Sequence, residues 1–368
     1  MLEERLRSAA GSLERSVAGV DATERLGELA VRRRRQQRAS AVLAVVVAAA
    51  VLGGVAVAVQ RARGPERVAG PATAAPARVV ATVPVPGTPV AVAVGDGAVW
   101  TVAADSNQVV RVDPASGRIT ARIRVPNGPA QLAVARDAVW VLCPPDNSVS
   151  RIDPAANRVV ATVPVGRSAT GLAVAAGSVW VASNLDDTVT RIDQAGNRVV
   201  ATVPVAREPT GLVTAGGAVW VALPAREGLG RIDPAGNRVR FVPVPRCCAG
   251  GLAAGEGALW AIWDGTLVRL DPATGRALAR VAISEAGAVY PYQVAVAGGA
   301  VWVASASTEV GTPQLLWRVD PRSMRVTGQL RLGTTPSRLL PIALAGRDEA
   351  LWVANGGAGA ILRLDPTP

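Results

Sequence analysis

The chemistry open to this chain is limited first by what the sequence lacks. Its 368 residues include no histidine, and every basic residue is an arginine. Histidine is the usual general base near neutral pH and the commonest metal ligand. The composition therefore excludes Ser-His-Asp, Cys-His and His-metal chemistry, and the missing lysine excludes Schiff-base and P-loop mechanisms.

Carboxylates are the groups that remain for acid–base work. Asp264 and Glu309 could serve as the carboxylates of a lyase or hydrolase, with or without a metal ion. Nothing in their spacing marks the two as a pair. We therefore expect no enzyme, no cofactor and no metal site.

Arginine and aromatic side chains instead suggest a binding patch, because large rigid side chains lose little entropy on contact. They gather in irregular loops of units four to six, where the repeat described below is broken, and both tyrosines of the chain are expected in one such loop. An equally weighted alternative is that they plug an uneven ring. The candidate ligand-binding residues are Arg226, Arg246, Trp263, Asp264, Tyr290, Tyr292 and Glu309.

The adjacent Cys247 and Cys248 could form a vicinal disulfide outside the cytoplasm or remain two free thiols. Cys143 stands alone three residues after a tryptophan and needs no role beyond filling space.

A repeat must position these residues. Tryptophans recur at forty-residue spacing from Trp100 to Trp260 and then at Trp302 and Trp352, and an aspartate after Arg-Ile, Arg-Val or Arg-Leu follows each one. Residues present in every unit are expected to pack the units or cap turns, so function is sought where the repeat breaks.

Each unit reads as four short strands with alternating apolar residues, and Asp-Pro-Ala-Gly-Asn or a variant separates the third from the fourth. Seven such units predict an all-β fold, a seven-bladed propeller of four-stranded antiparallel blades. The last unit lacks a fourth strand, whereas residues 78–85 form an orphan fourth strand before the first unit. We expect residues 78–85 to pair with residues 361–365 and close the ring.

The motifs Val-Trp-Val-Ala, Arg-Ile-Asp-Pro-Ala and Arg-Val-Val-Ala-Thr-Val-Pro-Val resemble the YVTN-type propeller repeats of bacterial surface and periplasmic proteins. The resemblance covers residues 78–368. More distantly, the chain resembles the streptogramin (virginiamycin) B lyases, seven-bladed propellers whose mechanism uses a histidine base and a magnesium ion. This sequence has no histidine for that role.

An uncharged apolar run at residues 39–59 is long enough to span a bilayer core of about 30 Å. Five arginines precede it and three follow closely, which places the N-terminus in the cytoplasm. We expect a short helical cytoplasmic tail at 1–38, one transmembrane helix at 39–59, a linker at 60–77 and an extracytoplasmic propeller at 78–368. A cleaved signal peptide is the alternative for the apolar run.

The net charge of +11 does not indicate nucleic-acid binding, because the arginines are spread over the repeats. We expect a membrane-anchored binding or sensing domain whose partner is an unknown protein, peptide or cell-wall ligand. In a first alternative the tail relays a signal to a cytoplasmic regulator. In a second the propeller is a lyase or hydrolase that uses carboxylates.

Overall fold

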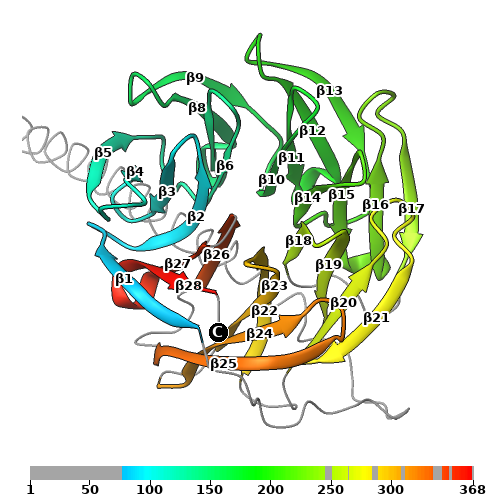
Figure 1. Cartoon of the computed structure of the whole chain (residues 1–368). Helices are drawn as coiled ribbons and strands as arrows, with labels where there is room; N and C mark the ends of the chain where they lie inside the picture. Colours follow the sequence, from blue (N-terminus) through cyan, green and yellow to red (C-terminus); the bar gives the residue numbers. More distant parts are fainter. Residues whose placement is uncertain are drawn as a thin grey trace, which may run out of the picture. The chain divides into compact units, whose positions relative to one another are not determined.

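The structure is a computed structural model that describes residues 77–244, 251–263, 265–283, 289–307, 311–334, 342–347 and 350–366. These residues form seven four-stranded antiparallel sheets arranged as blades around a centre (Figure 1). The predicted all-β, seven-bladed propeller is confirmed. No helix in the described ranges is long and apolar enough to cross a membrane, and the expected tail and span lie outside those ranges.

The first three blades follow the sequence repeat most regularly. Blade 1 contains β2 (Pro89–Gly95), β3 (Ala98–Ala103), β4 (Gln108–Val112) and β5 (Ile119–Arg124). Blade 2 contains β6 (Gln131–Val134), β7 (Val139–Cys143), β8 (Ser148–Asp153) and β9 (Arg158–Pro164). Blade 3 contains β10 (Ala169–Ala175), β11 (Ser178–Ser183), β12 (Thr188–Asp193) and β13 (Arg198–Pro204).

The next three blades keep the same strand order with less regular connections. Blade 4 contains β14 (Leu212–Ala215), β15 (Ala218–Leu223), β16 (Gly228–Ile232) and β17 (Val239–Pro243). Blade 5 contains β18 (Leu252–Gly255), β19 (Ala258–Trp263), β20 (Thr266–Leu270) and β21 (Ala277–Ala282). Blade 6 contains β22 (Val289–Ala297), β23 (Ala300–Ser307), β24 (Pro313–Asp320) and β25 (Arg325–Thr334).

Blade 7 joins the two ends of the propeller. Its strands are β26 (Ile342–Arg347), β27 (Ala350–Asn355), β28 (Ala360–Asp365) and, outermost, β1 (Arg78–Pro84). Arg78 lies opposite Asp365 and Pro84 opposite Ala360. The expected pairing of residues 78–85 with residues 361–365 is confirmed, and it leaves no blade one strand short.

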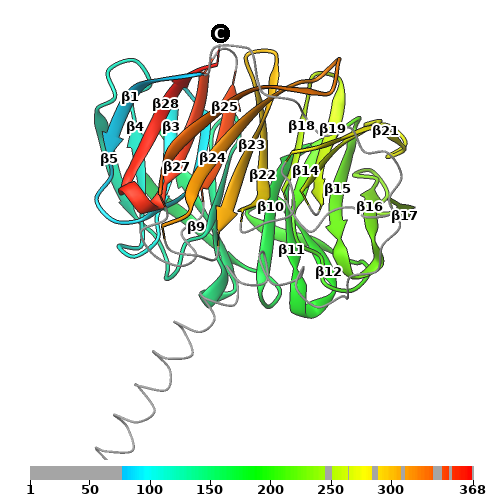
Figure 2. The same cartoon turned by 90° about the horizontal axis from the view of Figure 1, so that it is seen from below.

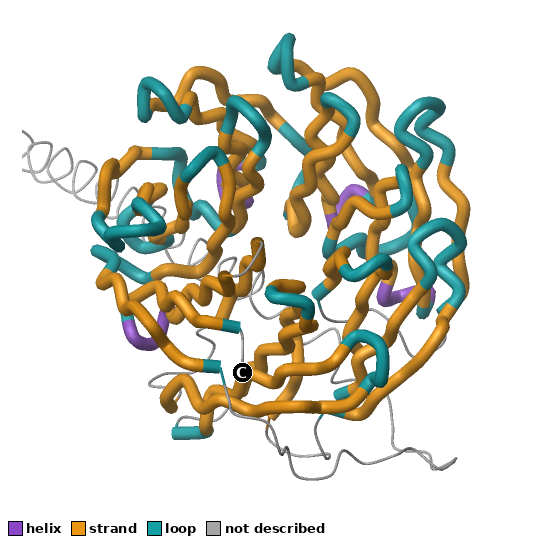
Figure 3. The backbone as a smooth tube through the Cα atoms, viewed as in Figure 1, coloured by secondary structure: helices purple, strands orange, loops and turns teal. Residues whose placement is uncertain are grey.

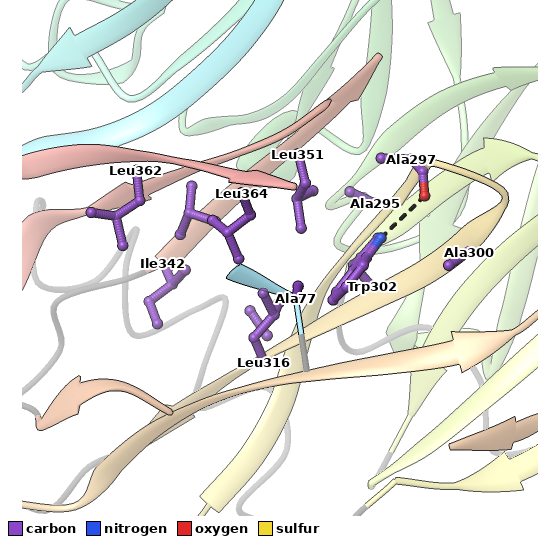
Figure 4. Close-up of a cluster of buried hydrophobic side chains, with 12 residues drawn as sticks. Ala77, Ala295, Ala297, Ala300, Trp302, Leu316, Ile342, Leu351, Leu362 and Leu364 are labelled. Carbon is purple, nitrogen blue, oxygen red and sulfur yellow. Dashed lines mark hydrogen bonds between the residues drawn. The ribbon is translucent and has the colours of Figure 1, made fainter. Parts of the chain in front are cut away.

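The hydrophobic core is divided into seven clusters, each shared by two neighbouring blades. In the cluster between blades 6 and 7, Trp302 packs with Leu316, Leu351 and Leu364, and the indole N–H donates to the Ala297 carbonyl oxygen (Figure 4). The repeated tryptophans are at most 1% exposed. Their predicted packing role is confirmed, because a single blade cannot bury its faces alone.

In blades 1 to 6 the repeated aspartates cap the turns between third and fourth strands, as expected. The Asp153 carboxylate accepts hydrogen bonds from the backbone N–H groups of Ala155 and Ala156. Asn157 ends that turn at a φ of 50°, in the left-handed region that asparagine tolerates. Equivalent turns recur around the ring, and the helical segments of the described chain are short 3₁₀ turns (Figure 3).

One expected loop is a strand. Tyr290 and Tyr292 were expected in a loop, but both belong to β22, the inner strand of blade 6. The strand has an irregularity between Pro291 and Gln293, where a proline without an N–H is tolerated. Aromatic residues also favour strands, which explains the extension of β22 beyond the repeat.

Candidate functional site

The two faces of the propeller differ in their connections. We call the loop face the one that carries the connections from second to third strands and from one blade to the next. We call the turn face the opposite one, which carries the turns between first and second and between third and fourth strands. The strands next to the irregular segments of blades 4 to 6 end at the loop face.

On the loop face of blades 1 to 3, aspartate carboxylates accept hydrogen bonds that hold neighbouring connections together. Asp105 accepts the backbone N–H of Thr88 at 2.8 Å, and Asp146 accepts that of Asn127 at 2.8 Å. Asp186 accepts both the backbone N–H and the side-chain Nε of Arg167, at 2.6 and 2.7 Å. These bonds hold the pKa of Asp186 below its ordinary value. The carboxylates of the regular blades are thus structural groups.

A second set of bonds crosses from blade to blade. Asn107, Asn147 and Asp187 end their connections at φ values of 52°, 46° and 53°. Their side chains accept the backbone N–H groups of Gly128, Ser168 and Glu208, respectively. Replacing one of these residues would therefore loosen the scaffold as well as alter the surface.

Blade 4 departs from this arrangement at Arg226. It occupies the position of Asp146 and Asp186, so a cation replaces the pinning carboxylate. The exposed guanidinium stacks over the ring of Phe241 in β17, 4.2 Å from its centroid. Phe241 is the only phenylalanine in the chain. The pair presents a planar cation held by an aromatic support, which suits a carboxylate or another planar anion.

Tyr292 lies between two blades. Its hydroxyl donates to the backbone carbonyl oxygen of Ile342, the first residue of β26 in blade 7. Burial raises the pKa of this phenol above its ordinary value. The structure gives Tyr292 a bridging role at the inner edge of the ring, and a direct ligand contact by this residue stays a prediction.

The remaining candidate residues are placed less completely. Trp263 ends β19 and lies opposite Thr266, and Tyr290 of β22 lies opposite Ala306 of β23. The segments that hold Arg246, Asp264, Glu309, Cys247 and Cys248 lie outside the described residues. Arg226 and Tyr292 belong to blades 4 and 6, so the described structure does not bring the predicted set together at one point.

The described residues show no group of three or more side chains suited to hold a metal ion. Cys143 is buried, and its burial together with the nearby Asp146 raises the pKa of the thiol to about 12. A thiol that stays protonated is a poor nucleophile, which agrees with the space-filling role expected of Cys143.

A series of polar contacts along the inner strands was not predicted from the sequence. The Gln131 amide donates to the Thr170 carbonyl oxygen at 2.9 Å, and the Thr170 hydroxyl donates to the Pro209 carbonyl oxygen at 2.9 Å. These bonds connect blades 2, 3 and 4 near the loop face. The only available signal was the polar residue at the start of these inner strands, where β2 has the sequence Pro-Val-Ala.

No protein-family model matches the chain, and no curated protein matches it. The chain does match solved structures. A streptogramin B lyase structure aligns at 17% identity and a TM-score of 0.64, covering 77% of this chain and 96% of that one. Virginiamycin B lyase from Staphylococcus aureus aligns at 16% identity and 0.62, covering 76% and 94%. The extracellular domain of a hybrid two-component system from B. thetaiotaomicron aligns at 15% and 0.59, covering 79% and 43%.

These likenesses show the propeller fold that the chain shares with the streptogramin B lyases, while no family model confirms the YVTN-type repeat. They also correct the expectation that the chain is not an enzyme, because two of the similar structures are lyases. The absence of histidine alone does not exclude enzymatic activity. At these identities the likeness shows the fold, and it carries no reaction over to this chain.

Proposed function

We propose that this chain is an extracytoplasmic binding or sensing propeller that takes a protein, peptide or cell-wall ligand on the loop face of blades 4 to 6. The observation that carries the proposal is Arg226. In blades 2 and 3 the equivalent position holds a carboxylate bonded to the neighbouring connection. In blade 4 it holds an exposed cation stacked on Phe241, which has no equivalent in those blades.

The likeness to an extracellular domain of a bacterial sensor system supports a sensing role at the level of the fold. Anchoring by residues 39–59, with residues 1–38 in the cytoplasm, is part of the proposal. It rests on the apolar run and on the arginines before it. Protease added to intact cells is expected to digest the propeller and spare residues 1–38. Protection of the propeller would reverse the proposed orientation.

The ligand proposal is tested by titrating the purified protein with soluble cell-wall fragments and with acidic peptides. Arg226→Ala is expected to weaken binding of the probe that binds by about tenfold or more, as removal of a central arginine contact does. Arg122→Ala, at an exposed position of β5, is the matched control. Equal affinities of the Arg226 and Arg122 variants would contradict the proposal. Asp146 and Asn147 are unsuitable controls because both hold connections in place.

A relay is the first alternative, in which residues 1–38 hold a cytoplasmic regulator. The short basic tail ahead of the apolar run motivates it. Residues 1–38 used as bait would retain one saturable cytoplasmic protein if the tail relays a signal. Absence of such a protein would leave the tail with the role of an anchor.

Catalysis is a second candidate, favoured by the fold shared with two lyases. Without histidine, such a reaction would have to use carboxylates such as Asp264 and Glu309. Turnover of a streptogramin B substrate that is lost in Asp264→Asn and Glu309→Gln would support it. No turnover of that substrate by the purified protein would remove the lyase reaction from consideration.

A further inference from the structure

A ring of exposed arginines runs around the turn face. In every blade an arginine stands at the first position of the fourth strand or directly before it, and all seven are exposed. The seven are Arg78, Arg118, Arg158, Arg198, Arg238, Arg276 and Arg325. We call them the ring arginines.

Exposed apolar side chains accompany this ring. Of the eight large hydrophobic residues that are exposed in the described chain, seven lie one or two positions after a ring arginine. They are Val79, Val80, Val160, Val199, Val200, Val239 and Leu278, and Val80 is the most exposed at 54%. Exposed valines repeated at one level of the ring form a rim that combines cationic and apolar side chains, a pairing typical of surfaces that bind the lipid–water interface.

The net charge of the turn face is positive. Each blade contributes a ring arginine and a third-strand arginine against the aspartate of its third strand. Among the described turns, Arg136 and Arg322 add two cations, whereas Asp96, Asp137 and Glu256 add three anions, so the balance stays positive. The aspartate lies opposite the ring arginine, as Asp153 lies opposite Arg158, so it offsets one of the two cations. The described loop face of blades 1 to 3 carries Asp105, Asp146, Asp186 and Asp187 against Arg124 and Arg167, while Arg207 and Glu208 offset each other. The propeller therefore has a charge difference between its faces, which orients it in the field of a charged surface.

The chain enters the propeller on the turn face. β1 begins at Arg78, opposite Asp365 at the end of β28, and both ends lie on one side of the ring (Figure 2). The 18 residues from 60 to 77 lead there from the apolar run. Fully extended, they reach about 60 Å at 3.3–3.6 Å per residue. A membrane crossed by residues 39–59 would thus lie within reach of the ring arginines.

From these observations we propose that the turn face docks on the anionic phospholipid headgroups of the membrane that anchors the chain. The proposal rests on the proposed anchoring by residues 39–59. The ring guanidinium groups bind lipid phosphates, and the adjacent valines enter the interfacial layer. Tethering makes this contact intramolecular, so each individual interaction can be weak. Docking would direct the loop face, with Arg226, away from the bilayer.

The test uses the full chain reconstituted in nanodiscs of phosphatidylcholine alone and in nanodiscs with about one third phosphatidylglycerol. Hydrogen–deuterium exchange is followed at the turns 113–118, 153–158 and 193–198 of the turn face and at 104–107, 144–147 and 184–187 of the loop face. We expect exchange at the turn face to slow severalfold in the anionic discs at low salt and to recover at high salt, because salt screens exposed charges. The loop face is expected to be unchanged.

Matched variants separate the ring from general charge. Arg158→Gln, Arg198→Gln and Arg238→Gln together are expected to abolish the protection. Arg122→Gln, Arg124→Gln and Arg207→Gln remove the same charge from exposed positions outside the ring and are expected to keep it. Val160→Ser with Val200→Ser is expected to reduce it. Equal exchange in the two lipids, or equal loss in both triple variants, would overturn the proposal.

Failure of the anchoring gives a different result. Anchored protein stays with the discs at high salt in both lipids, whatever the turn face does. If the chain instead leaves both kinds of disc, the anchoring proposal is wrong, and sedimentation with phosphatidylglycerol vesicles then tests the ring directly. Binding lost in the ring variant would support the lipid contact, and no binding would overturn it.

Discussion

The guanidinium of Arg363 in blade 7 donates a hydrogen bond of 3.2 Å to the backbone carbonyl oxygen of Pro114 in blade 1, although 249 residues separate the two. The same contact joins Arg111 to Pro154 and Arg191 to Pro234 in successive blades, at 2.6 Å each. Arg363 therefore repeats at the closure the bond that holds ordinary neighbours together. Closure of the ring uses both this bond and the pairing of β1 with β28.

Removing β1 is expected to destabilise the propeller by more than about 4 kcal/mol, since it exposes β28 and takes Val83 and Val85 out of the core between blades 7 and 1. A chain that starts at residue 87 should melt far below one that starts at residue 70. Similar melting temperatures for the two chains would show that the closure contributes little.

Arg191→Gln is expected to lower the free energy of unfolding by about 2–3 kcal/mol. The Arg191 guanidinium stacks on Trp180 and also donates to Ser178 and Pro234. Arg198→Gln, at an exposed ring arginine, is the control and should stay within about 0.5 kcal/mol of the parent in the absence of lipid. Urea unfolding followed by tryptophan fluorescence measures both, and equal effects would refute the bridging role of Arg191.

Ala176→Asn is expected to stabilise the protein by about 1 kcal/mol and to raise its melting temperature by a few degrees. Ala176 and Gly177 have φ values of 48° and 70°, as a type I′ turn requires, and asparagine tolerates that conformation better than alanine does. Blade 1 has Asp96 at this position, at a φ of 51°. Asp96→Ala should therefore lose stability, and a gain there would contradict the explanation.

Stability is expected to be flat from about pH 6 to pH 8 and to fall below about pH 4. No histidine titrates in the upper range. The pKa values of Asp113, Asp153, Asp271 and Asp320 are lowered, chiefly by the backbone N–H three residues further on. Their stabilising effect is complete above the unfolded pKa and is lost as the pH falls through the folded pKa.

Melting curves between pH 2 and pH 8 measure this dependence. The fourfold variant with asparagine at these positions should show a shallower fall in acid, because its turn side chains no longer titrate. A loss of stability between pH 6 and pH 8 would contradict the prediction.

Tyr292→Phe is expected to cost about 1–3 kcal/mol, because it removes the hydroxyl that donates to the Ile342 carbonyl oxygen. The aromatic ring is retained, so packing changes little. An unchanged midpoint of urea unfolding would mean that the hydroxyl does not bridge blades 6 and 7.

The repeat made the blades predictable, because Trp180 and Asp193 recur in step with residues of fixed local roles in packing and in turns. Local rules also identified the orphan strand at residues 78–85. Contacts across blades were not predictable: Arg111 and Pro154 are 43 residues apart, and nothing in either sequence position marks the other. The stacking of Arg226 on Phe241 lies within blade 4 and was also missed, because the alternation of residues in β17 does not show which loop side chain covers Phe241.

The exposure of these valines was not predicted, because apolar residues that alternate with polar ones usually lie on the buried face of a strand. Val199 and Val200 are both about 40% exposed or more, since the outermost strand of a blade has no neighbour on its outer edge. Tyr292 was assigned to a loop because proline and tyrosine interrupt the repeat there, although strand pairing continues around Pro291. The alternation of apolar residues and the turn residues therefore predict where the strands lie. They do not predict which side chains of the outermost strands are exposed to solvent.

The pairing of β1 with β28 also sets a schedule for biosynthesis. Of the propeller strands, β1 is synthesised first. The end of its partner strand β28, at Asp365, is synthesised 287 positions after Arg78. At about 5–20 residues per second, the first strand waits on the order of 15–60 s with its valines uncovered. The nascent propeller thus passes through a long interval in which six blades can form and the seventh cannot, and a chaperone that shields residues 78–85 would act during that interval.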